Sequence, residues 1–212
     1  MDLRPFIEST NLSATVHGKE IDTLVSEAID HQLLGVCVPP FWVKRAWREI
    51  AGRPLKLITV VGFPHGFQMT ETKSLEAQLA LRDGADEIDL VFHHTSFANN
   101  YPWTKIELAK ISKLVHDHSK LLKVIVEVSL WSRPELTRIC KLCVDAGVDF
   151  IKTSSGVNTP PCTSSDVEFI RQQIPDHVGL KAAGGIRDKT LALSLVNAGA
   201  DRIGTSAALK MI

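Results

Sequence analysis

Two lysines stand where buried strands are expected to end. Each follows an apolar run and precedes glycines, in residues 150–156 (FIKTSSG) and 179–187 (GLKAAGGIR). Lysine is among the residues least often buried, so Lys152 and Lys181, at matching points of two successive strands, indicate one cationic site. A lysine crowded by a second cation loses proton affinity and can attack a carbonyl group as a free amine. The pair therefore predicts covalent amine chemistry on a carbonyl substrate.

Two acidic residues fall near the ends of neighbouring apolar runs. Asp89 has apolar residues on both sides within residues 87–92, and Glu127 lies near the end of residues 122–128. Burying a lone carboxylate is costly, so we expect Asp89 to point into the interior and face one or both lysines. There it would carry protons. The alternative is a buried Asp–Lys pair that only sets strand register.

Glycine-containing segments follow the last three expected strands. Backbone N–H groups without bulky side chains can approach an anion, and a following helix N-terminus adds a favourable dipole. In barrels of alternating strands and helices, the loops after the seventh and eighth strands often bind phosphate. We therefore expect a phosphate site formed by Ser155, Gly156, Gly184, Gly185, Arg187, Gly204 and Ser206.

The order of strand and helix patterns predicts the fold. Short apolar runs without two-residue alternation are typical of parallel strands covered on both faces, and helical patterns alternate with them. Eight such units in 212 residues match a (β/α)8 TIM barrel of the α/β class, with residues 1–212 as a single domain. Strands are expected at residues 5–8, 35–38, 57–61, 87–92, 122–128, 149–152, 179–181 and 202–204, and helices at 18–32, 41–51, 71–83, 102–118, 134–146, 164–173, 189–198 and, in the tail, 206–211.

The alternative fold is a doubly wound open sheet. In that fold the first turn often carries a glycine-rich loop that binds a dinucleotide. Here the first turn, residues 9–12 (STNL), has no glycine, and neither the dinucleotide fingerprint nor the P-loop pattern occurs in the chain. These absences disfavour a nucleotide-binding fold.

Composition narrows the range of partners. Apolar residues make up 44% of the chain and charged residues 23%, with a formal net charge of zero and no long basic run. This balance argues against nucleic acid or an anionic membrane as the main partner and leaves a small phosphorylated molecule. The N-terminus lacks the apolar core of a secretory signal, and no apolar stretch approaches the ~18 residues of a membrane span. We therefore expect a cytoplasmic protein.

The cysteines and histidines carry weaker signals. Cys140 and Cys143 have metal-site spacing, but they lie in an expected helix and no second pair completes a zinc set, so we expect them to pack in the core. Cys37 is expected to be a buried thiol near a strand end, reactive if it opens onto the site. His93 and His94 would point to opposite faces of a strand and could not easily share one ion, so we expect one at the pocket rim. We expect no metal and no cofactor.

Seven short motifs occur in a fixed order over nearly the whole chain. They are VCV (36–38), VGFPHG (61–66), EIDLV (87–91), KVIVE (123–127), DFIKTS (149–154), KAAGGIR (181–187) and RIGTS (202–206). Together they resemble the deoxyribose-phosphate aldolase family, which are class I aldolases with a (β/α)8 barrel. The KTS and KAAGGIR motifs are the most specific part of the resemblance.

The resemblance implies roles for single residues. Lys152 matches the lysine that forms a Schiff base with the aldehyde donor, Lys181 the second lysine that lowers its proton affinity, and Asp89 the acid that moves protons through a bound water. Cys37 matches a cysteine near the active-site opening, and Thr10 and Glu127 are further candidates for the pocket wall. The implied reaction is the reversible cleavage of 2-deoxy-D-ribose 5-phosphate to D-glyceraldehyde 3-phosphate and acetaldehyde, without a metal. This reaction belongs to deoxyribonucleotide catabolism. Barrels of this size often form homodimers, although no residue here marks an interface.

The chain departs from the family pattern around the site. Pro39 stands where an asparagine is usual, residues 93–95 (HHT) replace Asn-Ile-Gly, Ala207 replaces a second serine, and Glu8 stands where an aspartate is common. These changes leave the three catalytic candidates intact and affect substrate fit and phosphate affinity. Two alternatives therefore stay open: a lysine Schiff-base lyase acting on a different aldehyde pair, and a non-catalytic barrel that binds a sugar phosphate.

Overall fold

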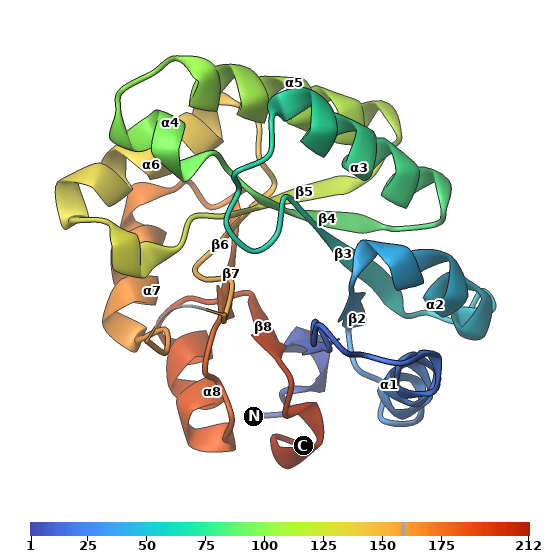
Figure 1. The fold of residues 1–212 in the computed structure, drawn as a ribbon. Helices are drawn as coiled ribbons and strands as arrows, with labels where there is room; N and C mark the ends of the chain where they lie inside the picture. The colour runs from blue at the N-terminus through green and yellow to red at the C-terminus, as the bar shows by residue number, and fades with distance from the viewer. Residues whose placement is uncertain (158–159) are drawn as a thin grey trace.

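Eight parallel strands close into a barrel in the order of the sequence (Figure 1). The computed structural model describes residues 1–157 and 160–212. Neighbouring strands pair in register, and the last pairs with the first, where Ile203 stands opposite Ile7. The expected (β/α)8 TIM barrel is confirmed. The strands are β1 (Ile7–Thr10), β2 (Gly35–Val38), β3 (Lys56–Val61), β4 (Glu87–Val91), β5 (Leu121–Ile125), β6 (Phe150–Lys152), β7 (Gly179–Ala183) and β8 (Arg202–Thr205).

Helices follow the strands and surround the barrel on its outside (Figure 1). None of those in the described residues is long and apolar enough to cross a membrane. The α-helices are α1 (Gly18–Asp30), α2 (Val43–Ile50), α3 (Thr70–Arg82), α4 (His94–Ala98), α5 (Trp103–Asp117), α6 (Arg133–Asp145), α7 (Ser164–Gln173) and α8 (Lys189–Asn197), and the 3₁₀ turns are η1 (Arg4–Phe6), η2 (Pro40–Trp42), η3 (Val128–Leu130) and η4 (Ala208–Lys210).

The strands separate an apolar outer face from a more polar inner one. Successive side chains of a strand point to opposite faces. Outward residues such as Val36 and Ile88 join the main apolar core, where the helices cover the sheet. Inside the barrel, Cys37, Ile58 and Val60 form a separate, small apolar cluster. Several other inward positions hold charged side chains, where such barrels usually hold branched apolar ones.

Among the strand boundaries that differ from the sequence prediction, those of the first and fifth strands bear most on the site. The first strand begins at Ile7 rather than at residue 5 because the turn η1 precedes it. This shift places Glu8 within the strand and Thr10 at its C-terminal end. The fifth strand ends at Ile125 rather than at residue 128. Glu127 has a left-handed backbone with a φ of 52°, a conformation that cannot continue a strand.

The two histidines after β4 do not lie on a strand, contrary to the expectation. The strand ends at Val91, and the unpredicted helix α4 follows, with the Nδ1 atom of His93 accepting the N–H of Ser96 at 3.3 Å. His94 packs edge-on against Phe92, and burial lowers its pKa to about 4. A cavity of about 720 Å³ opens at the C-terminal ends of the strands, and neither histidine lines it, so the expected rim position is wrong. Within the described residues, no three His, Cys, Asp or Glu side chains are placed to hold a metal.

Other boundaries follow from local capping and length. Helix α6 begins after Ser132, whose N–H donates to Glu135 at 2.8 Å in a capping box. The tail, residues 206–211, forms only the turn η4, because so short a segment cannot stabilise an isolated helix. Cys140 and Cys143 pack in the core as expected, and burial raises the pKa of Cys140 to about 12.

A buried ion pair ties α3 and α5 to the end of β4. Lys73 Nζ donates to Glu107 Oε1 at 2.9 Å and to the Val91 carbonyl at 2.9 Å, and neither charged side chain is exposed. Thr70 Oγ1 donates to the other carboxylate oxygen at 3.2 Å. These bonds fix the strand end two residues beyond Asp89.

We expect Glu107→Leu to lower the free energy of unfolding by about 3–5 kcal/mol, because it leaves the Lys73 ammonium buried without its carboxylate. Urea unfolding followed by circular dichroism measures the change. The double variant Lys73→Met/Glu107→Leu should recover most of the loss. Asp117→Ala, which breaks the exposed pair with Lys113, serves as the control and should cost less than about 1 kcal/mol. Equal losses of unfolding free energy in Glu107→Leu and Asp117→Ala would contradict the role assigned to the buried Lys73–Glu107 pair.

Candidate active site

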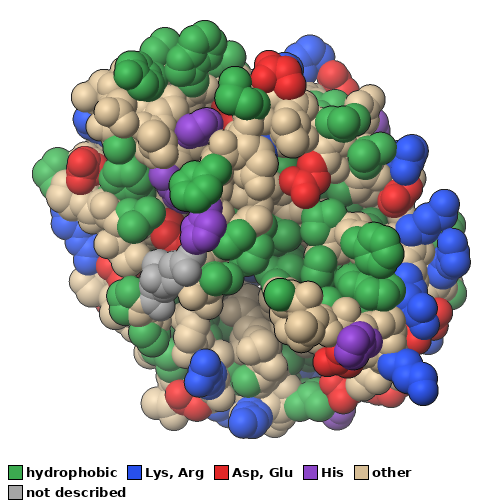
Figure 2. All heavy atoms as spheres, viewed as in Figure 1, with side chains coloured by type: hydrophobic (Ala, Val, Ile, Leu, Met, Phe, Trp, Pro, Cys, Tyr) green, Lys and Arg blue, Asp and Glu red, His purple; other side chains and the backbone are tan. Residues whose placement is uncertain are grey.

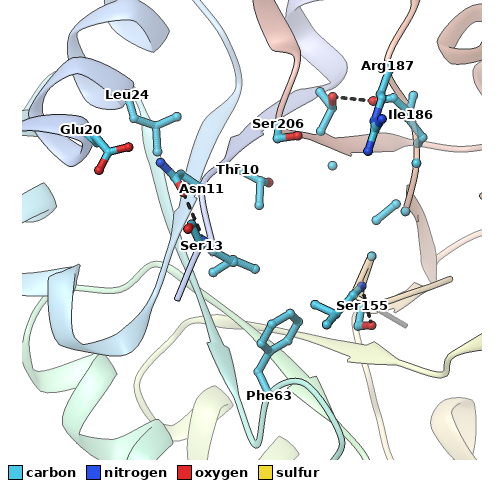
Figure 3. A pocket seen from close by; sticks show the side chains of 18 of the residues that line it. Thr10, Asn11, Ser13, Glu20, Leu24, Phe63, Ser155, Ile186, Arg187 and Ser206 are labelled. Carbon is cyan, nitrogen blue, oxygen red and sulfur yellow. Dashed lines mark hydrogen bonds between the residues drawn. The ribbon is translucent and has the colours of Figure 1, made fainter. Parts of the chain in front are cut away.

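A cavity of about 720 Å³ opens at the C-terminal ends of the strands. Figure 2 shows this face hollowed near its centre, and Figure 3 shows the side chains that line the hollow. Its walls come from the ends of β1, β6, β7 and β8 and from one face of α1. Of the sequence-predicted site residues, it brings together Thr10, Lys152, Ser155, Gly156, Gly184, Gly185, Arg187, Gly204 and Ser206.

Beneath the cavity, one carboxylate joins the two predicted lysines. Asp89 Oδ2 accepts from Lys152 Nζ at 2.9 Å and from Lys181 Nζ at 2.7 Å. Asp89 and Lys181 are fully buried, whereas the Lys152 side chain is 3% exposed and lines the cavity. Lys152 is therefore the member of this group that a small molecule in the cavity can reach.

Sequence reasoning missed a third lysine in this cluster. Lys123 Nζ lies 3.0 Å from Asp89 Oδ1, 2.5 Å from Glu87 Oε2 and 3.5 Å from Glu8 Oε1, and its side chain is not exposed. Glu8 also accepts from Lys181. The signal that singled out Asp89, an ionisable residue between apolar neighbours in a strand, is present at Lys123 as well.

Neighbouring charges hold Asp89 and Lys181 in their ionised forms. Burial alone would raise the pKa of Asp89, but Lys123, Lys152 and Lys181 outweigh it and hold that pKa well below its usual range. Burial likewise works against the ammonium of Lys181, and Asp89 and Glu8 reverse the effect and raise its pKa. Asp89 is therefore a carboxylate, and Lys181 an ammonium, at neutral pH.

Glu127 supports the loop after β6 from behind and does not line the cavity. Its two carboxylate oxygens accept the Ser155 N–H at 3.1 and 3.3 Å, and the side chain is almost fully buried. On either side of it, Val126 N–H donates to the Lys152 carbonyl at 3.0 Å and Val128 N–H to the Thr153 carbonyl at 2.9 Å. The segment after β5 thus fixes the backbone that carries Lys152 and Ser155.

Cys37 is the buried thiol that the sequence predicts, and it does not open onto the cavity, so its possible place in the pocket wall is wrong. Leu12 and Phe63, which line the cavity, pack against the cluster that contains Cys37 and cover it. The residue has no exposed surface, and burial raises the pKa of its thiol to about 11. A protonated thiol is a poor nucleophile.

The loops after β7 and β8 form a continuous wall of backbone. Gly184 and Gly185 have positive φ values of 97° and 71°, and a Cβ on Gly185 would lie 2.7 Å from a side-chain atom of Pro161. Thr205 Oγ1 donates to the Ile186 carbonyl at 2.7 Å and ties the two loops together. Figure 3 shows Arg187 and Ser206 on this side of the cavity, across from Asn11 and Glu20.

Comparisons with known proteins agree with this geometry. The family model for DeoC/LacD family aldolases matches residues 1–210. A deoxyribose-phosphate aldolase of Streptococcus uberis is 41% identical over 213 residues, covering 100% of this chain and 96% of that protein.

Two solved structures share the fold along almost the whole chain. The aldolase QR15 superposes with a TM-score of 0.94 at 36% identity, covering 100% of this chain and 94% of that one. The deoxyribose phosphate aldolase of Aeropyrum pernix, described as a tetramer, gives a TM-score of 0.93 at 34% identity, covering 99% of this chain and 88% of that one. The chain belongs to the DeoC/LacD family of aldolases.

Proposed function

We propose that this protein is a Schiff-base aldolase that reversibly cleaves 2-deoxy-D-ribose 5-phosphate to D-glyceraldehyde 3-phosphate and acetaldehyde. The observation that carries the proposal is the contact of Lys152, which lines the cavity, with a carboxylate that it shares with a fully buried second lysine. Such a pair supplies a nucleophilic amine next to a fixed positive charge. The names of the relatives support the choice of substrate.

The reaction begins with attack of the neutral Lys152 amine on the substrate aldehyde carbon. The carbinolamine loses water to give an iminium ion, which acts as an electron sink. Loss of the proton from the C3 hydroxyl then drives cleavage of the C2–C3 bond, with the electron pair passing into the iminium to form an enamine. D-Glyceraldehyde 3-phosphate leaves, the enamine is protonated at C2, and water hydrolyses the iminium to release acetaldehyde and Lys152.

Asp89 and Lys181 have different roles in these steps. Because three lysines hold Asp89 ionised, it acts as a hydrogen-bond acceptor that passes protons by way of a water molecule. Lys181, held charged by Asp89 and Glu8, places a fixed positive charge beside the amine of Lys152. This arrangement supplies both the nucleophile and the proton relay.

The phosphate group of the substrate would lie against the loops after β6, β7 and β8. Backbone N–H groups around Gly184, Gly185 and Gly204 approach the cavity without side chains between, and Ser206 adds a hydroxyl. Arg187 supplies a positive charge close to the N-terminus of α8, whose dipole also favours an anion. Thr10 and Ser155 line other parts of the cavity, where the sugar hydroxyls would lie.

We further propose that residues 1–212 form one domain, because pairing of β1 with β8 joins the two ends of the chain in one barrel.

The homodimer and the cytoplasmic location that the sequence suggests stay predictions, as does the absence of nucleic-acid and membrane partners. Light scattering of the purified protein tests the homodimer directly.

We expect sodium borohydride, added with 2-deoxyribose 5-phosphate, to attach one reduced acetaldehyde adduct to Lys152, because the reductant traps the iminium ion. Intact mass followed by peptide mapping locates the adduct. Lys152→Ala should abolish both the adduct and turnover while the fold persists, and Lys113→Ala, at an exposed lysine, should change neither. Residual turnover in Lys152→Ala comparable to the parent protein would remove Lys152 from the role of nucleophile.

We expect Arg187→Ala to raise KM for the phosphorylated substrate by about 10- to 100-fold, because one charge-assisted hydrogen bond contributes ~1.5–3 kcal/mol. Steady-state kinetics with 2-deoxyribose 5-phosphate and with unphosphorylated 2-deoxyribose measure the difference. Lys189→Ala provides the matched control, since Lys189 is an exposed cation two residues away that does not line the cavity. An equal effect of Arg187→Ala on both substrates would argue against a phosphate site at this loop.

A further inference from the structure

The interior of the barrel holds more positive than negative side chains. In the described residues, the inward-facing charged cluster contains four cations and three carboxylates joined by ion pairs shorter than 4 Å. If every member were ionised, the cluster would carry one uncompensated positive charge. Its members are Lys123, Lys152, Lys181, Arg202, Glu8, Glu87 and Asp89.

Arg202 forms the end of this cluster that lies away from the cavity. It is the first residue of β8, and its partner Glu87 is the first residue of β4. Arg202 Nη1 lies 3.2 Å from Glu8 Oε1 and 3.1 Å from Glu87 Oε2, and the guanidinium lies over the Phe150 ring at 4.7 Å from its centroid. The side chain is 13% exposed, so its charge is largely enclosed by the barrel.

The carboxylates are unequally shared among the cations. Lys123 contacts all three, and Lys181 contacts Glu8 and Asp89. Lys152 contacts Asp89 alone, through the same oxygen that Lys181 uses. Lys152 is also the lysine of this group that lines the cavity.

An uncompensated charge inside a protein is costly, and loss of one proton removes it. The guanidinium of Arg202 does not give up its proton in proteins. The proton must therefore come from a lysine, and Lys152 has the weakest hold on a carboxylate.

Strands β2 and β3 add no charge to the cluster, and the buried carboxylate of Glu127, beyond the end of β5, accepts the Ser155 N–H instead of a lysine of the cluster. From β2, Cys37 contributes a thiol that is neutral because burial raises its pKa to about 11. From β3, Ile58 and Val60 are apolar, and Lys56, at the start of the strand, is exposed to solvent. Without Arg202, Glu8 and Glu87 both keep a cationic partner, since Lys123 contacts both.

We propose that Arg202 is a positioning residue for the reaction, whose permanent charge occupies Glu8 and Glu87 and so makes Lys152 the lysine that reacts as a free amine. This inference rests on the proposed Schiff-base function. Arg202 acts through the ion-pair cluster from the end of the barrel opposite the cavity. Its removal should therefore change the pH at which Lys152 reacts, whereas a purely structural contact would change only stability.

The test follows imine formation at Lys152 as a function of pH. The full-length protein is mixed with acetaldehyde and sodium cyanoborohydride, and the rate of adduct formation on Lys152 is measured by mass spectrometry. Arg202→Met keeps the length of the side chain and removes its charge. The midpoint of the curve of adduct-formation rate against pH should therefore move to higher pH by about one unit, which is the size of shift expected for one charge in a buried cluster. Glu87→Gln removes a negative charge and should move the midpoint to lower pH. Arg202→Lys, which keeps the charge, should leave it near that of the parent.

Arg82→Met is the matched control, because it removes one positive charge from an exposed side chain of α3 and should leave the midpoint unchanged. Unchanged midpoints in folded Arg202→Met and Glu87→Gln would overturn the inference while Schiff-base chemistry stands. If Arg202→Met does not fold, Glu87→Gln alone decides, since a midpoint equal to that of the parent contradicts the inference. Absence of any Lys152 adduct in the folded parent protein would overturn the proposed function, and the inference with it.

Discussion

The carboxylate of Asp89, surrounded by three buried lysines, is the interaction on which the site depends. A lone carboxylate or a lone ammonium at this depth would be neutralised. The hydrogen bonds from Lys123, Lys152 and Lys181 to Asp89 fix its carboxylate, and the positive charges around it keep it ionised despite its burial. The barrel supplies the geometry, because parallel strands that are far apart in sequence bring their inward side chains to a common axis.

The outer face of the barrel wall has apolar packing, whereas the interior of the barrel accommodates the charged cluster. The outward strand residues form the continuous apolar core with the helices, and most of the stabilisation from apolar burial therefore lies outside the barrel wall. Inside, small residues leave room for the long cationic side chains. A Cβ at Gly204 would lie 2.9 Å from Lys181 Cε, so a glycine at this point of β8 lets the lysine extend toward Asp89.

The cavity and the buried ion-pair cluster have different chemical roles. The cavity wall of glycines, hydroxyls and Arg187 suits recognition of an anionic substrate, whereas the buried cluster suits control of protonation. Lys152 belongs to both, since it lines the cavity and contacts Asp89. Glu127 does not line the cavity, but its carboxylate accepts the N–H of Ser155. It thereby fixes the backbone that carries Lys152 and Ser155.

The sequence alone was sufficient for the order of the eight strands, the barrel and the choice of the two lysines and Asp89 as site residues. Apolar runs and glycine positions are local signals, and a lysine or aspartate within such a run is conspicuous on its own. The helical pattern around Cys140 and Cys143 likewise predicted correctly that both pack in the core.

Only the tertiary structure decided how the site is completed. The places of Lys123, Glu8 and Glu87 depend on strand register and on barrel closure, which bring together residues as far apart as Glu8 and Arg202. The same holds for Cys37, which the family resemblance placed near the active-site opening and which Leu12 and Phe63 cover. Short-range pattern in a sequence specifies which face of a strand a residue occupies, whereas its partners across the barrel are set by long-range packing that no local pattern encodes.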